Sequence, residues 1–401
     1  MRIYLETGNT ARVGARSGIP TVVRGLLSGL DSRQCDVHPV RWSFNEAALT
    51  PLKPKWESNL DRPGLKKSLL PLSSLSQPRS WPLWIRTMGM DYKAPVHLHP
   101  AHSSKLEGSW LILPELLQGP HIRLIADYAR LHKMRVAGIF YDAIPWLHPE
   151  LVLHRTASEH AEYMSALAGL DAVIAISNQS ARDFADFTRL KNLPQPSVHA
   201  CNLAAQISDQ PRETKLKERT GDVVKTLYVS TLEPRKNHLL LLAAFEDAGL
   251  RLGGINIELH MVGGSYKEAP GIAEAVRTAA KRNPKIHWHE NAGSVELRHF
   301  YRDSDFTIFA SSIEGFGLPV TESLWFGRPC LCSDEGVMAE NAKEGGCLTV
   351  NMKDQKAVAD GIVKLAGEQE FRRELGEQVL QRKLKTWNEY AGDVLQVLKG
   401  I

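Results

Sequence analysis

Cysteine is scarce in this chain. Among 401 residues only five are cysteine, an odd number, and no two of them form a Cys-x-x-Cys pair. A disulfide framework and a zinc knuckle are therefore not indicated. His97, His99 and His102 lie close together, but their spacing matches no common zinc pattern and Pro100 interrupts them. We expect a reduced protein without a metal site.

Long apolar runs and an excess of one charge are also missing. The longest apolar run, Leu239 to Phe245, is far shorter than the ~18 residues that span a bilayer. The first residues, Met1 to Gly8, read as a strand entering a glycine turn and lack the long apolar core of a signal peptide. The 49 basic and 45 acidic residues leave a net charge of +4, too weak for the dense basic face that binds nucleic acid. We expect a cytoplasmic protein with no nucleic acid partner.

The chain does contain short apolar runs that alternate with amphipathic segments of helix length, a pattern typical of α/β folds with parallel sheets. Its length exceeds what one hydrophobic core usually fills. The polar stretch from Ser208 to Asp222 reads as a linker. We therefore predict two Rossmann-like domains, over residues 1–207 and 223–384, joined by a linker over 208–222 and facing each other across a cleft.

Strands and helices are expected at definite places. In the first half the predicted strands are Arg2–Glu6, Trp110–Leu113, Val136–Tyr141 and Ala172–Ile176, and Ser177 is the predicted N-cap of the helix that follows. In the second half the predicted strands are Thr226–Ser230, Ile255–Val262, Ile286–His289, Phe306–Ala310 and Cys330–Cys332. The predicted helices there are His238–Asp247, Ile272–Arg282 and Pro319–Phe326.

Two cations precede a predicted helix in the second half. Arg235 and Lys236 stand directly before Asn237, which we expect to cap the helix that begins at His238. Cations are unfavourable at the positive end of a helix dipole unless an anion binds there as well. A diphosphate would suit this arrangement. The alternative is that both side chains simply point into water.

A second segment, Phe306 to Pro329, reads as strand, loop, helix and stop. Pro319 fits the first helical position, and Gly327 fits the position directly after the end of the helix. Gly315 and Gly317 let the loop backbone approach a ligand and aim N–H groups at it. Glu314 before the loop and Glu322 one turn into the helix would then bracket one crevice, where carboxylates can accept hydrogen bonds from paired sugar hydroxyls. The alternative is an ordinary turn acid and a surface helix residue.

Together these segments resemble the retaining, metal-independent glycosyltransferases of family four, which have the GT-B fold. The resemblance lies in Thr231-Leu-Glu-Pro-Arg-Lys-Asn237 and in the Glu-x7-Glu pair of Glu314 and Glu322. Met261-Val-Gly-Gly264 and Ile286-His-Trp-His289 are similar to the base-binding half of that family. Thr386-Trp-Asn-Glu-Tyr-Ala391 resembles its last helix, so residues 385–401 are expected to return to the first domain.

The resemblance implies a role for each matching residue. Arg235 and Lys236 would neutralise the departing diphosphate, and Glu314 would orient the transferred sugar together with the amides of Phe316, Gly317 and Leu318. Glu322 would hold the ribose. The remaining implied contacts with the donor are Gly18, in the loop from Ser17 to Pro20, and Asp142, Gly263, His289 and Gly315. Asp142 matches the His-Asp segment of the family, but Tyr141 stands where histidine is usual.

The implied activity is transfer of a hexose, mannose from GDP-mannose first and otherwise a UDP-linked sugar, with no cofactor besides this donor. The implied acceptor is a glycan or lipid-linked glycan of bacterial polysaccharide synthesis. Residues 51–93 are basic and contain tryptophans, so they could contact the inner face of a membrane; a solvated insertion explains them equally well. A nucleotide-sugar epimerase of the same architecture and a non-catalytic donor-binding subunit are the alternative functions.

Overall fold

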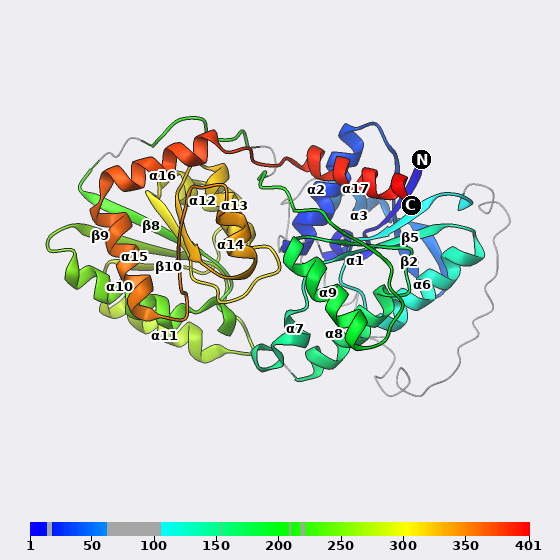
Figure 1. The fold of residues 1–401 in the computed structure, drawn as a ribbon, viewed down its shortest axis with the longest axis horizontal. Coiled ribbons are helices and arrows are strands. Elements are labelled where there is room, and N and C mark those ends of the chain that lie inside the picture. Colours follow the sequence, from blue (N-terminus) through cyan, green and yellow to red (C-terminus); the bar gives the residue numbers. More distant parts are fainter. Residues whose placement is uncertain (14–17, 62–105, 153, 208–209, 218–220) are drawn as a thin grey trace.

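The computed structural model describes residues 1–13, 18–61, 106–152, 154–207, 210–217 and 221–401. They form two α/β domains that lie side by side, each with its own sheet covered by helices (Figure 1). The sheets are parallel except at one edge of the first. This confirms the predicted GT-B architecture.

The first domain contains a seven-stranded sheet in the order β3-β2-β1-β4-β5-β6-β7. Its strands are β1 (Arg2–Glu6), β2 (Asp36–Ser43), β3 (Ala48–Pro51), β4 (Trp110–Leu113), β5 (Arg135–Phe140), β6 (Ala172–Ala175) and β7 (Ser197–Ala200). Its helices are α1 (Gly8–Val13), α2 (Gly18–Ser32), α3 (Pro54–Asp61), α6 (Gly119–Leu131), α7 (Ile144–Leu147), α8 (His154–Leu167) and α9 (Asn178–Leu190), with a 3-10 turn at Pro149–Leu151.

The second domain contains a six-stranded, wholly parallel sheet in the order β10-β9-β8-β11-β12-β13. Its strands are β8 (Val223–Val229), β9 (Asn256–Val262), β10 (Ile286–His289), β11 (Phe306–Phe309), β12 (Cys330–Ser333) and β13 (Cys347–Val350). Its helices are α10 (His238–Arg251), α11 (Pro270–Arg282), α12 (Ser294–Asp303), α13 (Leu318–Trp325), α14 (Gly336–Ala342), α15 (Gln355–Gly367) and α16 (Gln369–Gln381), with a 3-10 turn at Pro234–Lys236.

The strand order reverses at one place in each sheet. In the first domain this place lies between β1 and β4, and in the second between β8 and β11. The loops that leave two such strands diverge to opposite sides of the sheet and open a crevice at the carboxyl ends, where ligands of these folds bind. The loops after β8 and β11 contain both segments that the sequence analysis selected.

The predicted strands are all present, with ends that differ by at most three residues. Strands such as β4, β6 and β11 are buried at every position, as sheets covered on both faces require. The sequence analysis missed β2, β3, β7 and β13. These strands lie at or next to the sheet edges and are largely half-exposed, so they contain polar residues that hide the apolar pattern.

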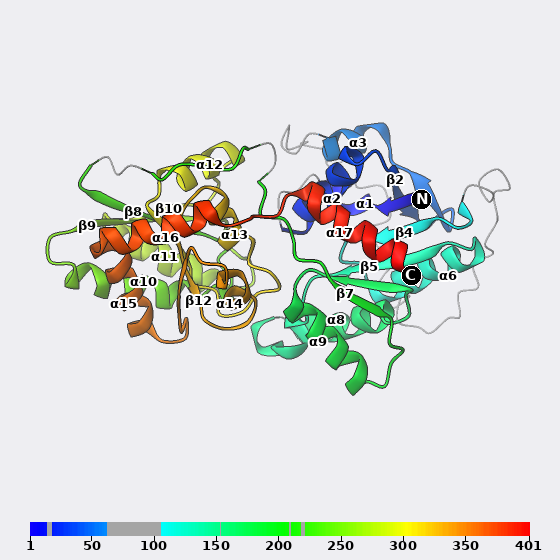
Figure 2. The same ribbon diagram turned by 45° about the horizontal axis from the view of Figure 1, so that its top comes forward.

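The chain crosses between the domains twice, at neighbouring places (Figures 1 and 2). The Ala205 N–H donates to the Lys385 carbonyl at 2.9 Å, and the Trp387 indole donates to the Gln206 carbonyl at 2.9 Å. After the second crossing α17 (Trp387–Gly400) packs against α2, where a Cβ on Gly29 would lie 2.3 Å from the Trp387 carbonyl oxygen. Residues 210–217, within the predicted linker, lie along the second domain, where the Glu213 N–H donates to the Trp325 carbonyl.

Candidate active site

The loops after β8 and β11 are fastened together at the second switch point. The carbonyl oxygen of Arg235, in the 3-10 turn that follows β8, accepts the Ser312 N–H at 2.9 Å and the Ser312 hydroxyl at 3.1 Å. The Tyr228 hydroxyl, near the end of β8, donates to the next carbonyl, that of Lys236. These bonds hold the two cations directly beside the loop that contains Glu314.

Glu314 forms an ion pair with each of the two cations. Its Oε2 lies 2.8 Å from Nη1 of Arg235, and its Oε1 contacts Nζ of Lys236. Arg235 also pairs with Glu233, at 3.0 Å between Nε and Oε2. The Lys236 and Glu314 side chains are each only 10% exposed and that of Arg235 is 21% exposed, so the alternative that both cations point into water is wrong.

The charges of this cluster stabilise one another. Burial alone would raise the pKa of Glu314, but the charges and hydrogen bonds of Lys236 and Arg235 outweigh it and lower that pKa to about 2. Burial lowers the pKa of Lys236, because the attraction of Glu314 is partly cancelled by the neighbouring guanidinium. The pKa of Arg235 rises despite burial, since Glu314 and Glu233 both stabilise its charge. At neutral pH Glu314 is therefore a carboxylate held between the Lys236 and Arg235 side chains.

The anion that the sequence analysis expected beside the two cations is thus supplied, in this structure, by the protein itself. Glu314 reaches them from the loop after β11, which local sequence around Arg235 could not reveal. With Glu233, which pairs with Arg235, the two cations face two carboxylates, so the cluster is balanced in formal charge. A phosphate that enters the crevice would meet a guanidinium and an ammonium already held in position.

Two helices begin at the same crevice without a side-chain cap. Neither α10, after Lys236, nor α13, after the glycine loop, has its first N–H groups bonded by a capping side chain of the described residues. Asn237 occupies the N-cap position of α10 as predicted, but its side chain does not cap the helix: its backbone is left-handed (φ 61°) and its amide donates to the Met352 carbonyl at 2.6 Å. Uncapped helix starts favour an anion. Pro319 occupies the second position of α13, not the first, because the helix begins at Leu318.

Glu322 has a partner that the sequence analysis missed. The Tyr301 hydroxyl, from α12, donates to Oε2 of Glu322 at 2.8 Å. Burial raises the pKa of Glu322, and this hydrogen bond opposes the rise only in part. Tyr301 is 1% exposed and 21 residues away in sequence, so no local pattern pointed to it.

Gly263 and His289 lie together at the ends of β9 and β10. The Gly263 N–H donates to the His289 carbonyl at 3.2 Å, and the Trp288 indole donates to the Gly263 carbonyl at 3.0 Å. A Cβ on Gly263 would lie 1.8 Å from the Ser230 carbonyl oxygen, and its φ of 149° suits glycine. Close packing of β8 and β9 therefore explains this glycine without a ligand.

The glycine loop of the second domain touches the first domain directly. The Gly315 carbonyl accepts the Ser177 hydroxyl at 2.9 Å, and the Ser180 hydroxyl donates to the Tyr141 carbonyl at 2.7 Å. A Cβ on Gly315 would lie 2.6 Å from the Tyr141 carbonyl oxygen, so only glycine fits here. The predicted N-cap Ser177 is confirmed, since it accepts the Ser180 N–H, and it also joins the domains.

The remaining selected residues lie around this contact. Asp142 is buried near the cation cluster, and burial raises its pKa against the opposing effects of His160 and Arg235. A Cβ on Gly18 would lie 3.8 Å from Cδ1 of Leu318, across the two domains. Phe316 is 5% exposed and its carbonyl accepts the Asn341 amide at 2.6 Å, while Gly317 (φ 80°) is the N-cap residue of α13.

Residues 209–382 match the family described as glycosyl transferases group 1. This stretch contains the whole cation cluster, the glycine loop and Glu322. The second domain is a glycosyl transferases group 1 domain. Among curated proteins, the serotype-specific mannosyltransferase WbdA of Escherichia coli is 30% identical over 229 residues, 53% of this chain but 28% of WbdA. The O-antigen chain mannosyltransferase B of Escherichia coli is 22% identical over a match that spans 66% of this chain and 70% of that protein.

Solved structures extend the similarity in fold to the first domain. Anabaena HepE, solved in complex with UDP and glucose, superposes over 100% of both chains with a TM-score of 0.66 and 12% identity. The superposition on the UDP-forming trehalose-phosphate synthase of Burkholderia xenovorans spans 73% of this chain and 72% of that one, with a TM-score of 0.57 and 13% identity. At these identities the likeness concerns the fold. The set of relatives does not favour the epimerase alternative.

Tyr141, the departure from the family pattern, does not face the crevice. Its hydroxyl donates to the Pro114 carbonyl at 2.5 Å inside the first domain, and the residue is 8% exposed. Its side chain therefore cannot replace a histidine in contact with a ligand. The histidine at this place in the structure is His160 of α8, whose Nε2 lies 2.8 Å from the Asp142 carbonyl oxygen, so the imidazole donates there. Sequence reasoning missed His160, because it comes 18 residues later.

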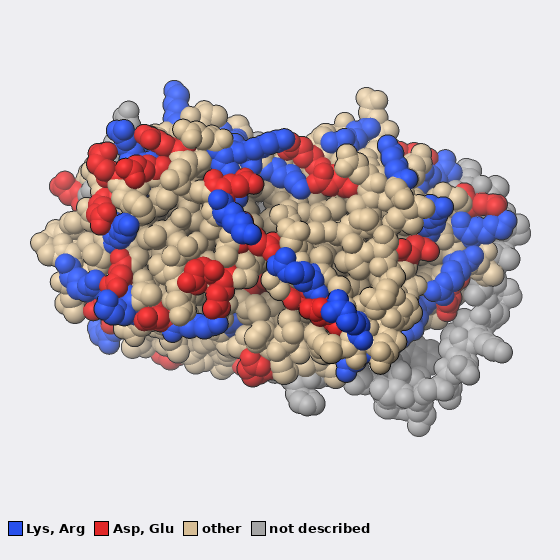
Figure 3. Space-filling model, viewed as in Figure 1, with Lys and Arg blue, Asp and Glu red and all other residues tan. Residues whose placement is uncertain are grey.

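Some predictions fall outside the described residues: Ser17, the cluster His97, His99 and His102, and most of residues 51–93. Of the tryptophans in that region, only Trp56 is described, and it lies half-buried with the cations of Arg41 and Lys53 over its ring. No helix in the described ranges has the length and hydropathy to cross a bilayer. On the face drawn in Figure 3, basic and acidic side chains are interspersed over both domains.

Proposed function

We propose that this protein is a retaining, metal-independent glycosyltransferase that moves a hexose from a nucleotide sugar to a glycan acceptor in bacterial polysaccharide synthesis. The observation that carries the proposal is the pairing of Arg235 and Lys236 with Glu314 at the switch point of a glycosyl transferases group 1 domain. Two pre-positioned cations and two uncapped helix starts match the charge of a diphosphate leaving group. Stabilising that charge as it develops is the main electrostatic demand of the reaction.

The neighbouring groups support one direction for the donor in the crevice. The diphosphate binds at Arg235 and Lys236, the nucleoside extends toward Glu322, Gly263 and His289, and the sugar lies under the glycine loop near Asp142. Because Glu314 is a carboxylate at neutral pH, it can accept hydrogen bonds from sugar hydroxyls while it keeps the cations in place. The acceptor approaches from the first domain, whose Asp142 and Gly18 lie opposite this loop.

We propose GDP-mannose as the first donor to test, because the curated relatives with the longest matches are named mannosyltransferases. UDP-linked hexoses come second, since HepE was solved with UDP and glucose. A thermal-shift screen against GDP-, UDP- and dTDP-sugars identifies the donor, because a ligand that binds only the folded state raises the melting temperature with concentration. Transfer is then measured with that donor in buffer containing a chelator, on mannose-containing oligosaccharide acceptors.

The outcomes separate the alternatives. Transfer with the anomeric configuration kept, and unaffected by the chelator, supports the proposal. Isomerisation of the nucleotide sugar without an acceptor would indicate an epimerase instead. Donor binding with neither reaction on any acceptor would indicate a donor-binding subunit. No stabilisation by any nucleotide sugar would contradict the proposal as a whole.

A further inference from the structure

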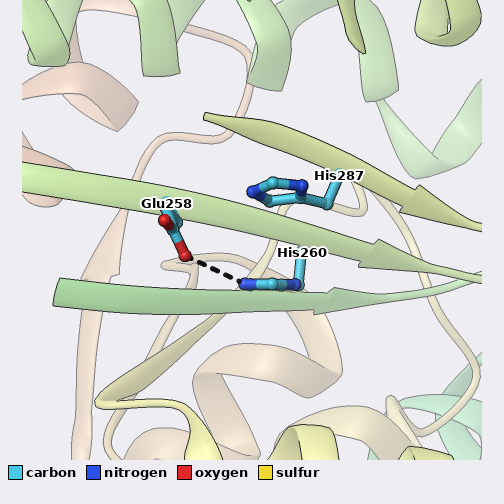
Figure 4. A group of neighbouring side chains, drawn as sticks. All are labelled: Glu258, His260 and His287. Carbon is cyan, nitrogen blue, oxygen red and sulfur yellow. Dashed lines mark ion pairs between the residues drawn. The ribbon is translucent and has the colours of Figure 1, made fainter. Parts of the chain in front are cut away.

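A group of imidazoles lies on one face of β9 and β10, apart from the cation cluster. His260 of β9 is paired in register with His287 of β10, and their rings stack with centroids 4.7 Å apart. Glu258 lies two residues before His260 and so projects from the same face. Figure 4 shows the two rings on neighbouring strands with the Glu258 carboxylate directed toward His260.

Two nitrogens of this group have no hydrogen-bond partner. Nε2 of His260 and Nε2 of His287 are both buried, and neither is bonded within the described part of the chain. Buried polar atoms without a partner are costly and rare, so each calls for an explanation. One ligand atom from each of Glu258, His260 and His287 lies within 4.8 Å of the other two.

The spacing fits atoms that share a cation. Nε2 of His260 and Oε2 of Glu258 are 3.5 Å apart without forming a hydrogen bond. Two ligands at ~2.05 Å from a tetrahedral zinc ion are about 3.3 Å apart.

A further histidine fixes the orientation of the first. Nδ1 of His260 lies 3.2 Å from Nε2 of His289. With a cation on Nε2, Nδ1 of His260 carries the proton and donates to His289, which is the arrangement that orients metal-bound imidazoles in proteins. The neighbouring acid Asp303 is already paired with Lys225 at 2.7 Å between Oδ2 and Nζ, so it does not complete the set.

We propose that Glu258, His260 and His287 form a binding site for a divalent transition-metal cation, Zn²⁺ first, with water in the remaining position. Two imidazoles and one carboxylate suit Zn²⁺, Ni²⁺ or Co²⁺ and disfavour Mg²⁺ and Ca²⁺, which prefer oxygen ligands. Its ligands do not include Arg235, Lys236 or Glu314, so the cation takes no part in the transfer chemistry. It joins the middle of β9 to the start of β10.

The test measures metal binding by the whole chain without any nucleotide sugar. Protein stripped with a chelator is dialysed against ZnCl2, and bound zinc is counted by elemental analysis and titrated by calorimetry. The matched variants are His287→Ala and Glu258→Gln, with His299→Ala, an exposed histidine of α12, as the control. We expect one equivalent of zinc to be lost, or its affinity to fall at least about tenfold, in both variants and not in the control.

Other measurements keep the result unambiguous. Circular dichroism in the presence of chelator shows whether a variant has folded. If His287→Ala does not fold, Glu258→Gln still tests the site, because glutamine has nearly the same side-chain volume as glutamate. Co²⁺ in place of zinc should give the visible absorption of a four-coordinate site in wild type and not in Glu258→Gln. Zinc binding equal in wild type and both variants, or no binding by wild type, overturns the proposal. Neither result bears on transferase activity, which is assayed separately in chelator.

Discussion

The two domains have the same strand order but opposite chemistry at their switch points. In the first domain, Glu6 at the end of β1 and Glu115 after β4 accept the N–H groups of Gly8, Asn9 and Thr10, so they satisfy the start of α1. In the second, the corresponding place holds Arg235 and Lys236, and no side chain in the described part of the protein caps the helix starts.

The proposed function explains this difference by what each crevice would accept. Acids that already satisfy a helix start leave its N–H groups unavailable to a phosphate, whereas cations beside helix starts without a side-chain cap attract one. Burial, and then the neighbouring Glu115, raise the pKa of Glu6 to about 8, so this carboxyl is largely protonated at physiological pH. Under the proposal, the same Rossmann-like layout serves as an anion site in the second domain and not in the first.

Removing either cation should have the largest effect. We expect Arg235→Ala and Lys236→Ala each to lower kcat/KM for transfer by about 100- to 1000-fold, because a charge-assisted contact to the leaving group is lost. Steady-state kinetics with the identified donor measures this. Arg251→Ala is the matched control, since Arg251 lies at the end of α10 and pairs with the surface acids Asp247 and Asp360. Wild-type rates in both cation variants would remove Arg235 and Lys236 from the mechanism.

Glu314→Gln should destabilise the second domain by about 3 kcal/mol, since two buried cations lose their shared carboxylate. The pKa of Glu314 falls from 4.5 to about 2 on folding, so this stabilisation is complete above pH 4.5 and is lost as the pH falls toward 2. The free energies of unfolding of wild type and variant, measured with denaturant, should differ by the same amount at pH 6 and pH 8 and by less at pH 3. The control is Glu335→Gln, which removes a surface ion pair with Lys353. A loss of stability in this control equal to that of Glu314→Gln would contradict the prediction.

Glu6→Gln should act in the opposite direction and stabilise the first domain. The pKa of Glu6 rises from 4.5 to about 8 on folding, so the wild-type chain loses stability as the pH rises from 4.5 to 8, while the uncharged amide does not. We expect a gain on the order of 1–3 kcal/mol at pH 8 that vanishes near pH 4.5. Thermal unfolding across this range measures it, with the exposed Glu57→Gln as control. A gain that is independent of pH would point to packing instead.

The smallest effect is expected where the two domains touch. Gly315→Ala places a methyl group 2.6 Å from the Tyr141 carbonyl oxygen, so the glycine loop must move away from the first domain. We expect transfer to slow about tenfold with little change in unfolding, because reacting groups shift by a fraction of an ångström. Arg182→Ala, which removes a cross-domain pair with Glu340 whose arginine is 58% exposed, should change neither. Equal rates for both variants would mean that this contact does not position the site.

The sequence predicted those features that depend on neighbours along the chain. The central strands, the glycine loop and the N-cap Ser177 all follow from local patterns of burial and hydrogen bonding. It could not predict contacts that depend on how strands are ordered in a sheet. The pairing of Glu314 with Lys236, the bond from Tyr301 to Glu322 and the stacking of His260 on His287 each join distant segments.

The side chains of Asn237 and Tyr141 show the same limit. Asn237 has the residue type and position of a helix cap, but the Met352 carbonyl offers its side chain a better partner than the helix start. Tyr141 stands at the carboxyl end of β5, yet its long side chain turns back to the Pro114 carbonyl. In both cases tertiary packing, and not the local pattern, decides the direction of the side chain.

The double crossing between the domains restricts how they can move. Because Ala205 is bonded to Lys385 and Trp387 to Gln206, both connections bend together at one place. A single flexible connection would let one half rotate freely in any direction, whereas two bonded ones favour a narrow range of opening and closing movements. Release of the spent nucleotide would then need only a small rotation, which separates Gly315 from Ser177 and returns along the same path.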